Sequence, residues 1–245
     1  MSRYKGEILL IISSFVFALT ALFVKFTSVY FNGIFITSVR FVIGIFLTII
    51  IMKILKIKFI VENLKDWLLR GFFGSIAMVA FYLSISITSS GRAVMLNDTY
   101  PIFVALFGYL FFKERIYKND IVGLFLCLIG IFFIFYERES YSVVGDILGL
   151  ISGISSGFAI HYVKRSTMTN HPVIVYFSAC IVGLLFIPFS FTDKVDVSMI
   201  SIILVIIVGV LTFFAQLFMS YGYKYVSATK GSIIIYMQIP IVLLL

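Results

Sequence analysis

Runs of about twenty apolar residues, separated by short charged segments, constrain this chain more than any other feature of its sequence. One run of that length crosses the ~30 Å hydrocarbon core of a bilayer as an α-helix. We predict nine such spans, at residues 8–30, 33–53, 67–88, 91–112, 119–136, 144–163, 172–191, 198–221 and 229–245. Charged residues make up 12% of the chain, whereas soluble domains carry about a quarter. The sequence therefore predicts an all-α polytopic membrane protein.

Basic residues are divided unequally between the loops. Fourteen lie at the N-terminus or after an even-numbered span: Arg3, Lys5, Lys53, Lys56, Lys58, Lys65, Arg70, Lys113, Arg115, Lys118, Lys164, Arg165, Lys224 and Lys230. Four lie in the alternate loops: Lys25, Arg92, Arg138 and Lys194. Because cytoplasmic loops carry an excess of Lys and Arg, we predict a multi-pass protein of the cell (inner) membrane with a cytoplasmic N-terminus. The net charge of +8 follows from these loops and does not indicate a nucleic-acid partner.

The chain also resembles itself at an offset of 139 residues. Identical residues of uncommon types meet at that offset: Gly6 and Gly145, Lys25 and Lys164, Gly44 and Gly183, Tyr82 and Tyr221, Pro101 and Pro240. The offset contains five spans, an odd number, so the two copies enter the membrane in opposite senses, as in many secondary transporters. We predict an inverted repeat of two five-helix units, at 1–139 and 140–245. A second unit of equal length would pass Leu245, so we expect the last helix to be missing from this chain.

Several segments resemble the EamA branch of the drug/metabolite transporter superfamily. They are "SVRF" with Arg40, "SGRAVMLNDTYPIFVALFGYLFFKER" with Pro101 and Glu114, the Gly-rich "DIVGLFLCLIGIFFI", "GDILGLISGISSGFAIHYVKR", and "VSATKGSIIIYMQIPIV" with Pro240. The resemblance implies ten helices in two inverted repeats and transport of a small organic metabolite, without naming the substrate. It also implies a cavity lined by spans one, three, four, six, eight and nine.

Two charged residues, Arg40 and Asp98, are placed deep within the predicted spans. A carboxylate at the centre of a membrane helix costs about 2.5–3.5 kcal/mol on insertion scales, so it normally faces the protein interior and marks a pathway. Each charge lies seven residues after a glycine at the start of its span, Gly33 or Gly91, which puts both ~10 Å below one surface. We predict that Asp98 pairs with Arg40 in one state and with a proton or a cationic substrate group in another. A structural ion pair is the alternative.

Pro101 and Pro240 fall inside predicted spans, where a proline kinks the helix and removes the donor for a carbonyl four residues earlier, here Asn97 and Tyr236. Freed carbonyls at membrane depth are typical of transporter sites, although a kink can also serve packing alone. Besides Arg40 and Asp98, the residues that we expect to bind substrate or couple transport are polar or aromatic: Asn97, Tyr82, Tyr100, Gln216, Tyr221, Tyr236 and Gln238.

A second motif allows a rival interpretation. Gly153–Gly157 fits the G-x-S-x-G pattern of serine hydrolases, with Ser155 as the nucleophile and His161 nearby. It lies in an apolar helical run, where small residues more often let membrane helices approach closely. Cys127 and Cys180 lie in apolar runs and are expected in the core rather than at a metal.

Other charged residues stand at the ends of spans. Lys25 and Lys164 end spans one and six, where long side chains reach the interface. Lys113, Glu114 and Arg115 form either a gate or an ordinary helix end, which favours cations.

We predict a secondary transporter of small organic metabolites that works by alternating access, coupled to protons or by exchange. The chain contains no nucleotide-binding motif, and we expect no cofactor, no metal and no catalytic residue. Its predicted partners are a small-molecule substrate and the lipid bilayer. A membrane-embedded enzyme, which would need convergent catalytic groups at one depth, and a non-transporting scaffold are the alternatives. The sequence predicts neither the direction of transport nor the oligomeric state.

Overall fold

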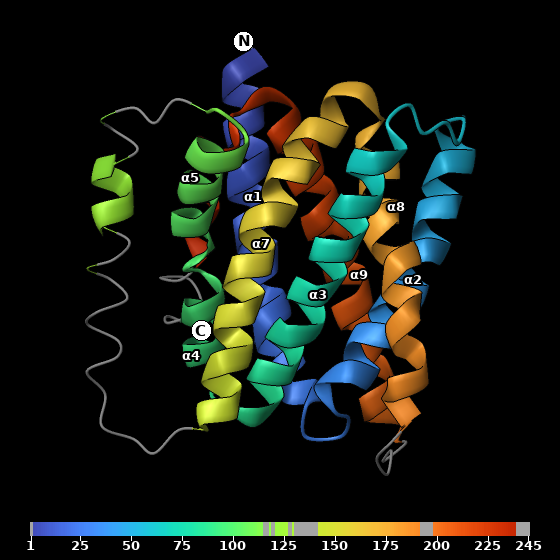
Figure 1. The fold of residues 1–245 in the computed structure, drawn as a ribbon. Coiled ribbons are helices and arrows are strands. Elements are labelled where there is room, and N and C mark those ends of the chain that lie inside the picture. Colours follow the sequence, from blue (N-terminus) through green and yellow to red (C-terminus); the bar gives the residue numbers. More distant parts are fainter. Residues whose placement is uncertain are drawn as a thin grey trace.

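The computed structural model of the chain describes residues 2–114, 118, 121–126, 129, 142–191 and 198–238. These residues form α-helices, one 3-10 helix (η1) and their connections (Figure 1). The elements are α1 Ser2–Thr27, α2 Gly33–Ile54, α3 Leu64–Ile87, α4 Ser90–Asn97, α5 Tyr100–Phe111, α7 Val143–Thr169, α8 Pro172–Gly183, η1 Leu184–Phe191, α9 Met199–Tyr225 and α10 Ala228–Ile235. The predicted all-α polytopic fold is confirmed.

The helix starts follow from polar residues placed just before apolar runs. A side chain at the N-cap accepts a hydrogen bond from an N–H group of the first turn, which has no partner within the helix. Six Asn and Ser residues make this bond: Asn32, Asn63, Ser89, Ser142, Ser198 and Ser227. At α9 the bond is reciprocal, because the hydroxyl of Ser201 also accepts from the N–H of Ser198.

In the described part of the chain, seven segments are long and apolar enough to cross a membrane: Tyr4–Thr27, Gly33–Ile54, Leu64–Ile87, Gly91–Phe111, Val143–Thr169, Pro172–Ser190 and Met199–Tyr225. They correspond to the predicted spans one to four and six to eight. The predicted fifth span, 119–136, lies largely outside the described residues, as does the end of the ninth, with Pro240. The outer faces carry exposed apolar side chains such as Phe46, Leu110 and Leu185, as expected where lipid is the solvent.

The helices pack as two principal antiparallel pairs, α1 with α9 and α3 with α7 (Figure 1). Glycines allow both contacts. A Cβ at Gly6 of α1 would lie 2.8 Å from side-chain atoms of Tyr225 and Val226 beside the end of α9. A Cβ at Gly145 of α7 would lie 3.3 Å from Thr88, just after α3. We call the end of the bundle where α1 begins, at the top of Figure 1, the N-terminal face, and the other end the opposite face.

The predicted fourth span differs from the expected kinked helix, because it is broken into two. Helix α4 ends at Asn97, Asp98 is its C-cap residue, and α5 begins at Tyr100. Pro101 therefore lies in the first turn of α5, where its missing N–H removes no helical bond and its fixed φ suits the helix start. The span predicted at 172–191 also changes geometry, since α8 gives way to the 3-10 helix η1 at Leu184.

Candidate functional site

A cavity of about 100 Å³ lies inside the bundle. Helices α1, α3, α4, α5, α7, α9 and α10 line it, as expected for spans one, three, four, six, eight and nine, and α2 contributes Arg40. The wall is apolar over much of its area and carries a few polar groups, the usual composition of a small-molecule site.

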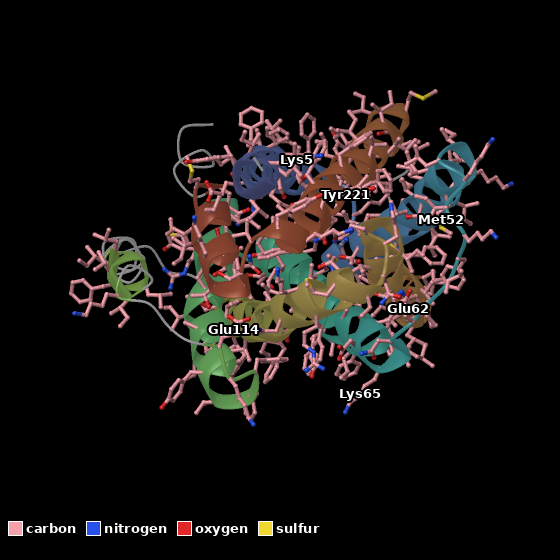
Figure 2. The ribbon with its side chains drawn as sticks, turned by 90° about the horizontal axis from the view of Figure 1, so that it is seen from above. Lys5, Met52, Glu62, Lys65, Glu114 and Tyr221 are labelled. Carbon is pink, nitrogen blue, oxygen red and sulfur yellow. The ribbon has the colours of Figure 1, made fainter. Side chains whose placement is uncertain are left out.

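Six of the predicted site residues line this cavity: Arg40, Tyr82, Asn97, Tyr100, Gln216 and Gln238. Three do not. Asp98 lies behind Asn97 and Gln238, which it contacts. Tyr221 lies near the N-terminal face (Figure 2), where its hydroxyl is 3.4 Å from Nε2 of His171. Tyr236 packs against the buried cluster that contains Tyr82.

Asp98 is completely buried at the break between α4 and α5. The amide nitrogen of Asn97 donates to its carboxylate at 2.9 Å, and the amide nitrogen of Gln238 donates to both of its oxygens. On the other side of Asn97, the hydroxyl of Ser152 lies 2.6 Å from Oδ1. The carboxyl group is therefore held by two neutral amides that connect it to α7 and to the segment after α10.

The predicted contact between Asp98 and Arg40 is absent. Among the described residues, no cation forms an ion pair with Asp98. Arg40 is 1% exposed, contacts the sulfur of Met78, and places its guanidinium carbon 4.9 Å and 5.3 Å from the ring centres of Phe41 and Tyr82. Equal depth along two helices does not make two side chains face each other, and Arg40 turns towards its aromatic neighbours instead.

The interpretation of Arg70 as a loop residue was wrong. Arg70 lies in the second turn of α3, is 1% exposed and lines the cavity. Its Nη2 donates to Oε1 of Gln216 on α9 at 2.9 Å. Gly74, one turn further along α3, makes room for the guanidinium, since a Cβ there would overlap Nη1 of Arg70. The small residue at position i+4 is the sequence signal that could have shown the arginine turning inward.

The G-x-S-x-G segment packs helices together. Gly149, Gly153 and Gly157 form one face of α7, and this face lies against the broken α4–α5 segment. A Cβ at Gly153 would lie 2.6 Å from Oγ1 of Thr99 and 2.9 Å from the carbonyl oxygen of Leu96. The motif thus lies inside a continuous helix, not on the strand-to-helix turn that presents a hydrolase nucleophile. His161 is bonded elsewhere, with Nε2 2.7 Å from the carbonyl oxygen of Val104.

Charged side chains connect helices across the N-terminal face. Nζ of Lys230 donates to Glu7 at 2.5 Å, and Nε of Arg165 donates to Asp66 at 3.0 Å. Glu114, which follows α5, lies 3.5 Å from Nδ1 of His161 and accepts from the hydroxyl of Thr229 at 3.3 Å. Figure 2 looks onto this face, with Glu114 beside the end of α5 and Lys65 at the rim.

These contacts lower the pKa of the Glu114 carboxyl group. Burial would raise its pKa, but the hydrogen bonds with His161 and Thr229 and the charges of His161 and Lys164 outweigh burial. The pKa of Glu114 therefore lies below its ordinary value. Glu114 is the part of the predicted Lys113–Arg115 gate that makes cross-helix contacts in the described structure.

The opposite face carries a bidentate ion pair, in which Nε and Nη2 of Arg92 each lie 2.7 Å from an oxygen of Asp146. Lys25 donates there to the carbonyl oxygens of Ile85 and Thr88 at the end of α3. Lys164 does the same at the N-terminal face, donating to the carbonyl oxygen of Tyr223 at 3.0 Å. Both lysines thus satisfy helix-end carbonyls rather than reaching for the interface. Polar contacts thus connect the helices at both ends of the bundle.

In the described part of the chain, seven membrane-length segments form a bundle with an internal cavity that buried arginines line, an arrangement typical of polytopic membrane proteins that bind small molecules within the bilayer. The chain belongs to the EamA-like transporter family, whose sequence pattern matches residues 4–136 and again residues 143–245. The resemblance seen in the sequence motifs is therefore confirmed.

Similar proteins are transporters as well. The pseudopaline exporter of Pseudomonas aeruginosa (strain UCBPP-PA14) is 26% identical over 238 residues, which cover 96% of this chain and 84% of the exporter. An uncharacterized transporter of Archaeoglobus fulgidus is 28% identical over 91% of this chain and 81% of its own length. A solved crystal structure superposes on 99% of this chain and 86% of its own with a TM-score of 0.76 and 15% identity, and so shares the fold. These relatives support membrane transport by this chain.

Proposed function

We propose that this protein is a secondary transporter of small organic metabolites, which works by alternating access and without ATP. The observation that carries the proposal is the internal cavity, which is lined by buried arginine and amide side chains at membrane depth. Charged groups within spans are rare and normally mark a substrate or ion pathway. We place the protein in the cell membrane with its N-terminus inside, on the distribution of Lys and Arg between the loops.

The inverted repeat, with units at 1–139 and 140–245, is part of this proposal. The family pattern matches the chain twice, once in each unit. Shifted by 139 residues, α1 would span 141–166 and α4 would span 229–236, close to the bounds of α7, Val143–Thr169, and α10, Ala228–Ile235. The two lysines also make equivalent contacts at that offset, Lys25 with the carbonyl of Ile85 and Lys164 with that of Lys224.

The ion pairs at the two faces support alternating access. At about 100 Å³, the cavity is smaller than the ~300–1,000 Å³ of typical ligand pockets, so a bound metabolite requires it to widen. Opening the N-terminal face would separate Glu7 from Lys230, and opening the opposite face would separate Arg92 from Asp146. Both pairs are partly exposed to solvent, with side chains 15% to 37% accessible, and exchanging one open face for the other would break one pair while the other re-forms.

Asp98 is the residue that we propose for coupling. It is buried with two neutral amide donors and no cation among the described residues. An unpaired carboxylate in a medium of low dielectric is strongly disfavoured, so a proton or a cationic group must accompany it. Asn97 and Gln238 contact both the carboxyl group and the cavity. The charge state of Asp98 can thereby change the cavity wall.

The test is transport by purified protein in liposomes, with a metabolite panel and an imposed pH gradient. Asp98→Asn keeps the size of the side chain and removes the charge, so this variant should fold normally and lose most transport or its dependence on the gradient. Glu62→Gln is the matched control, since Glu62 is exposed in the loop before α3. If Asp98→Asn transports at the wild-type rate and with the wild-type pH profile, Asp98 has no part in coupling.

Export is the direction that we propose first, because the pseudopaline exporter is named for export. The same liposomes test it, since protein can be inserted in both orientations and one orientation blocked with an impermeant thiol reagent at an engineered cysteine. Export predicts that the metabolite accumulates in the liposomes only through protein molecules whose N-terminal face is exposed to the added metabolite. Accumulation only through the other orientation indicates uptake.

A further inference from the structure

Two arginines face the cavity without a counter-charge. Arg40 and Arg70 are each 1% exposed and both line it. A guanidinium stays protonated in proteins and can only donate hydrogen bonds. Within the described structure, neither forms an ion pair with a carboxylate. In the part of the chain that the structure describes, no carboxylate therefore neutralises these two positive charges.

The hydrogen bonds of the two guanidinium groups are also incomplete. Nε of Arg40 and both Nε and Nη1 of Arg70 are buried and have no hydrogen-bond partner. What they do contact is neutral: the sulfur of Met78 for Arg40 and the amide oxygen of Gln216 for Arg70. Buried donors are nearly always satisfied, so each exception in a native structure needs an explanation. Among the described residues, three of the nine such atoms belong to these two arginines, and both arginines line one cavity.

Neighbouring residues leave space for the two guanidinium groups and hold them in place. Gly74 lies directly against the guanidinium of Arg70, where any side chain would collide with it. The ring of Tyr82 lies beside Arg40 and its hydroxyl is 3.0 Å from Oγ1 of Thr212, so the ring is fixed in place. Both arginines are thus held by their surroundings rather than free to reach water, which is the condition for a preorganised anion site.

We propose that Arg40 and Arg70 together bind an oxyanion of the transported molecule, a carboxylate or a phosphate. This inference rests on the proposed transport function and specifies its substrate class. The guanidinium fork matches the oxygen atoms of both groups and binds them through charge-assisted hydrogen bonds. A single anion bound by both arginines would accept hydrogen bonds from their unpaired N–H groups. It would also neutralise their two positive charges, which otherwise repel each other. Substrates without an anionic group leave that charge buried and are rejected.

The binding test uses matched probes on the purified full chain in detergent, at constant ionic strength. The probes are acetate and acetamide, 4-methylpentanoate and 4-methylpentanamide, L-leucine and L-leucinamide, and inorganic phosphate. We expect at least one carboxylate to raise the unfolding temperature more than its amide does, or inorganic phosphate to raise it more than the neutral amides do. The probe that stabilises the protein then shows whether the oxyanion is a carboxylate or a phosphate. If neither any carboxylate nor phosphate stabilises the protein beyond the neutral amides, the proposal is overturned.

Variants separate binding from folding. Arg70→Gln should weaken the binding of the stabilising anion on the order of 10- to 100-fold, the loss of one charge-assisted contact, and Arg70→Lys should retain part of it. Lys65→Gln, which removes an exposed cation on the same helix, is the control and should bind normally. Without anion, Arg70→Gln should unfold at or above the wild-type temperature, because it removes an uncompensated charge. Anion binding unchanged in Arg70→Gln, or a large loss of stability without anion, contradicts the proposal.

The same proteins in liposomes distinguish the two proposals. If the anion binds in an Arg70-dependent manner but crosses the membrane no faster than in empty liposomes, transport fails and the anion site stands. If a metabolite is transported equally by wild type and Arg70→Gln, the anion site fails and transport stands.

Discussion

Gly153→Ala tests the packing of α7 on the broken α4–α5 segment. The added Cβ would lie 2.6 Å from Oγ1 of Thr99, 2.9 Å from the carbonyl oxygen of Leu96 and 3.1 Å from that of Asn97. Two of these three atoms belong to the main chain and cannot rotate away. Overpacking of this kind typically costs ~1–3 kcal/mol, and the better helix propensity of Ala returns about 1 kcal/mol. We expect the free energy of unfolding to fall by roughly 2 kcal/mol, since rigid neighbours put the cost near its upper limit.

The assay is equilibrium unfolding in mixed micelles with increasing SDS, followed by the fluorescence of Trp67. Gly91→Ala is the matched control, because a Cβ at Gly91 meets nothing within 4 Å. This control should leave stability unchanged or raise it by up to about 1 kcal/mol. Equal stability of the two alanine variants would refute the argument that α7 touches the main chain of the α4–α5 break.

Two further predictions concern the ends of the bundle. Because the pKa of Glu114 is lowered in the folded protein, its stabilising contribution is present above the unfolded pKa of ~4.3 and is lost as the pH falls through the lower, folded value. The difference in stability between wild type and Glu114→Gln should therefore be constant above about pH 5 and shrink in acid, and a difference that grows in acid would contradict this assignment. For topology, a cysteine at Lys58 should resist an impermeant thiol reagent added to intact cells, whereas one at Ser140 should react, and the reverse pattern would invert the orientation.

The spans were predictable because a bilayer imposes one requirement on all of them, a stretch of apolar residues of fixed length. Helices α2, α3 and α9 begin within three residues of the predicted edges, and α1 begins six residues before its predicted edge. The role of the glycines in α7 was predictable for the same reason, since helices in lipid pack through small residues. Hydropathy could not predict that α4 ends at Asn97, because the break depends on where Pro101 falls relative to the neighbouring helices.

The site was only partly predictable, because hydropathy gives the depth of a residue and not the direction in which it points. Asp98 and Arg40 were expected to meet at one depth, but Asp98 binds Asn97 and Gln238 and Arg40 faces aromatic rings. Arg70 was counted among the basic loop residues after span two, although position 70 falls inside the predicted span 67–88. Gly74 and Gln216 draw it into the cavity, and contacts between distant helices leave little trace in a single sequence.

The break between α4 and α5 also bears on how the protein is made. Helix α4 has 8 residues and α5 has 12, or about 12 Å and 18 Å of length at 1.5 Å per residue, so neither crosses the bilayer alone. The open main chain between them cannot face lipid, where each unsatisfied polar group costs several kcal/mol, and it is Gly153 of α7 that lies against it. A ribosome delivers α4 and α5 well before α7. We therefore expect the segment to reach its final conformation only after α7 has been inserted beside it.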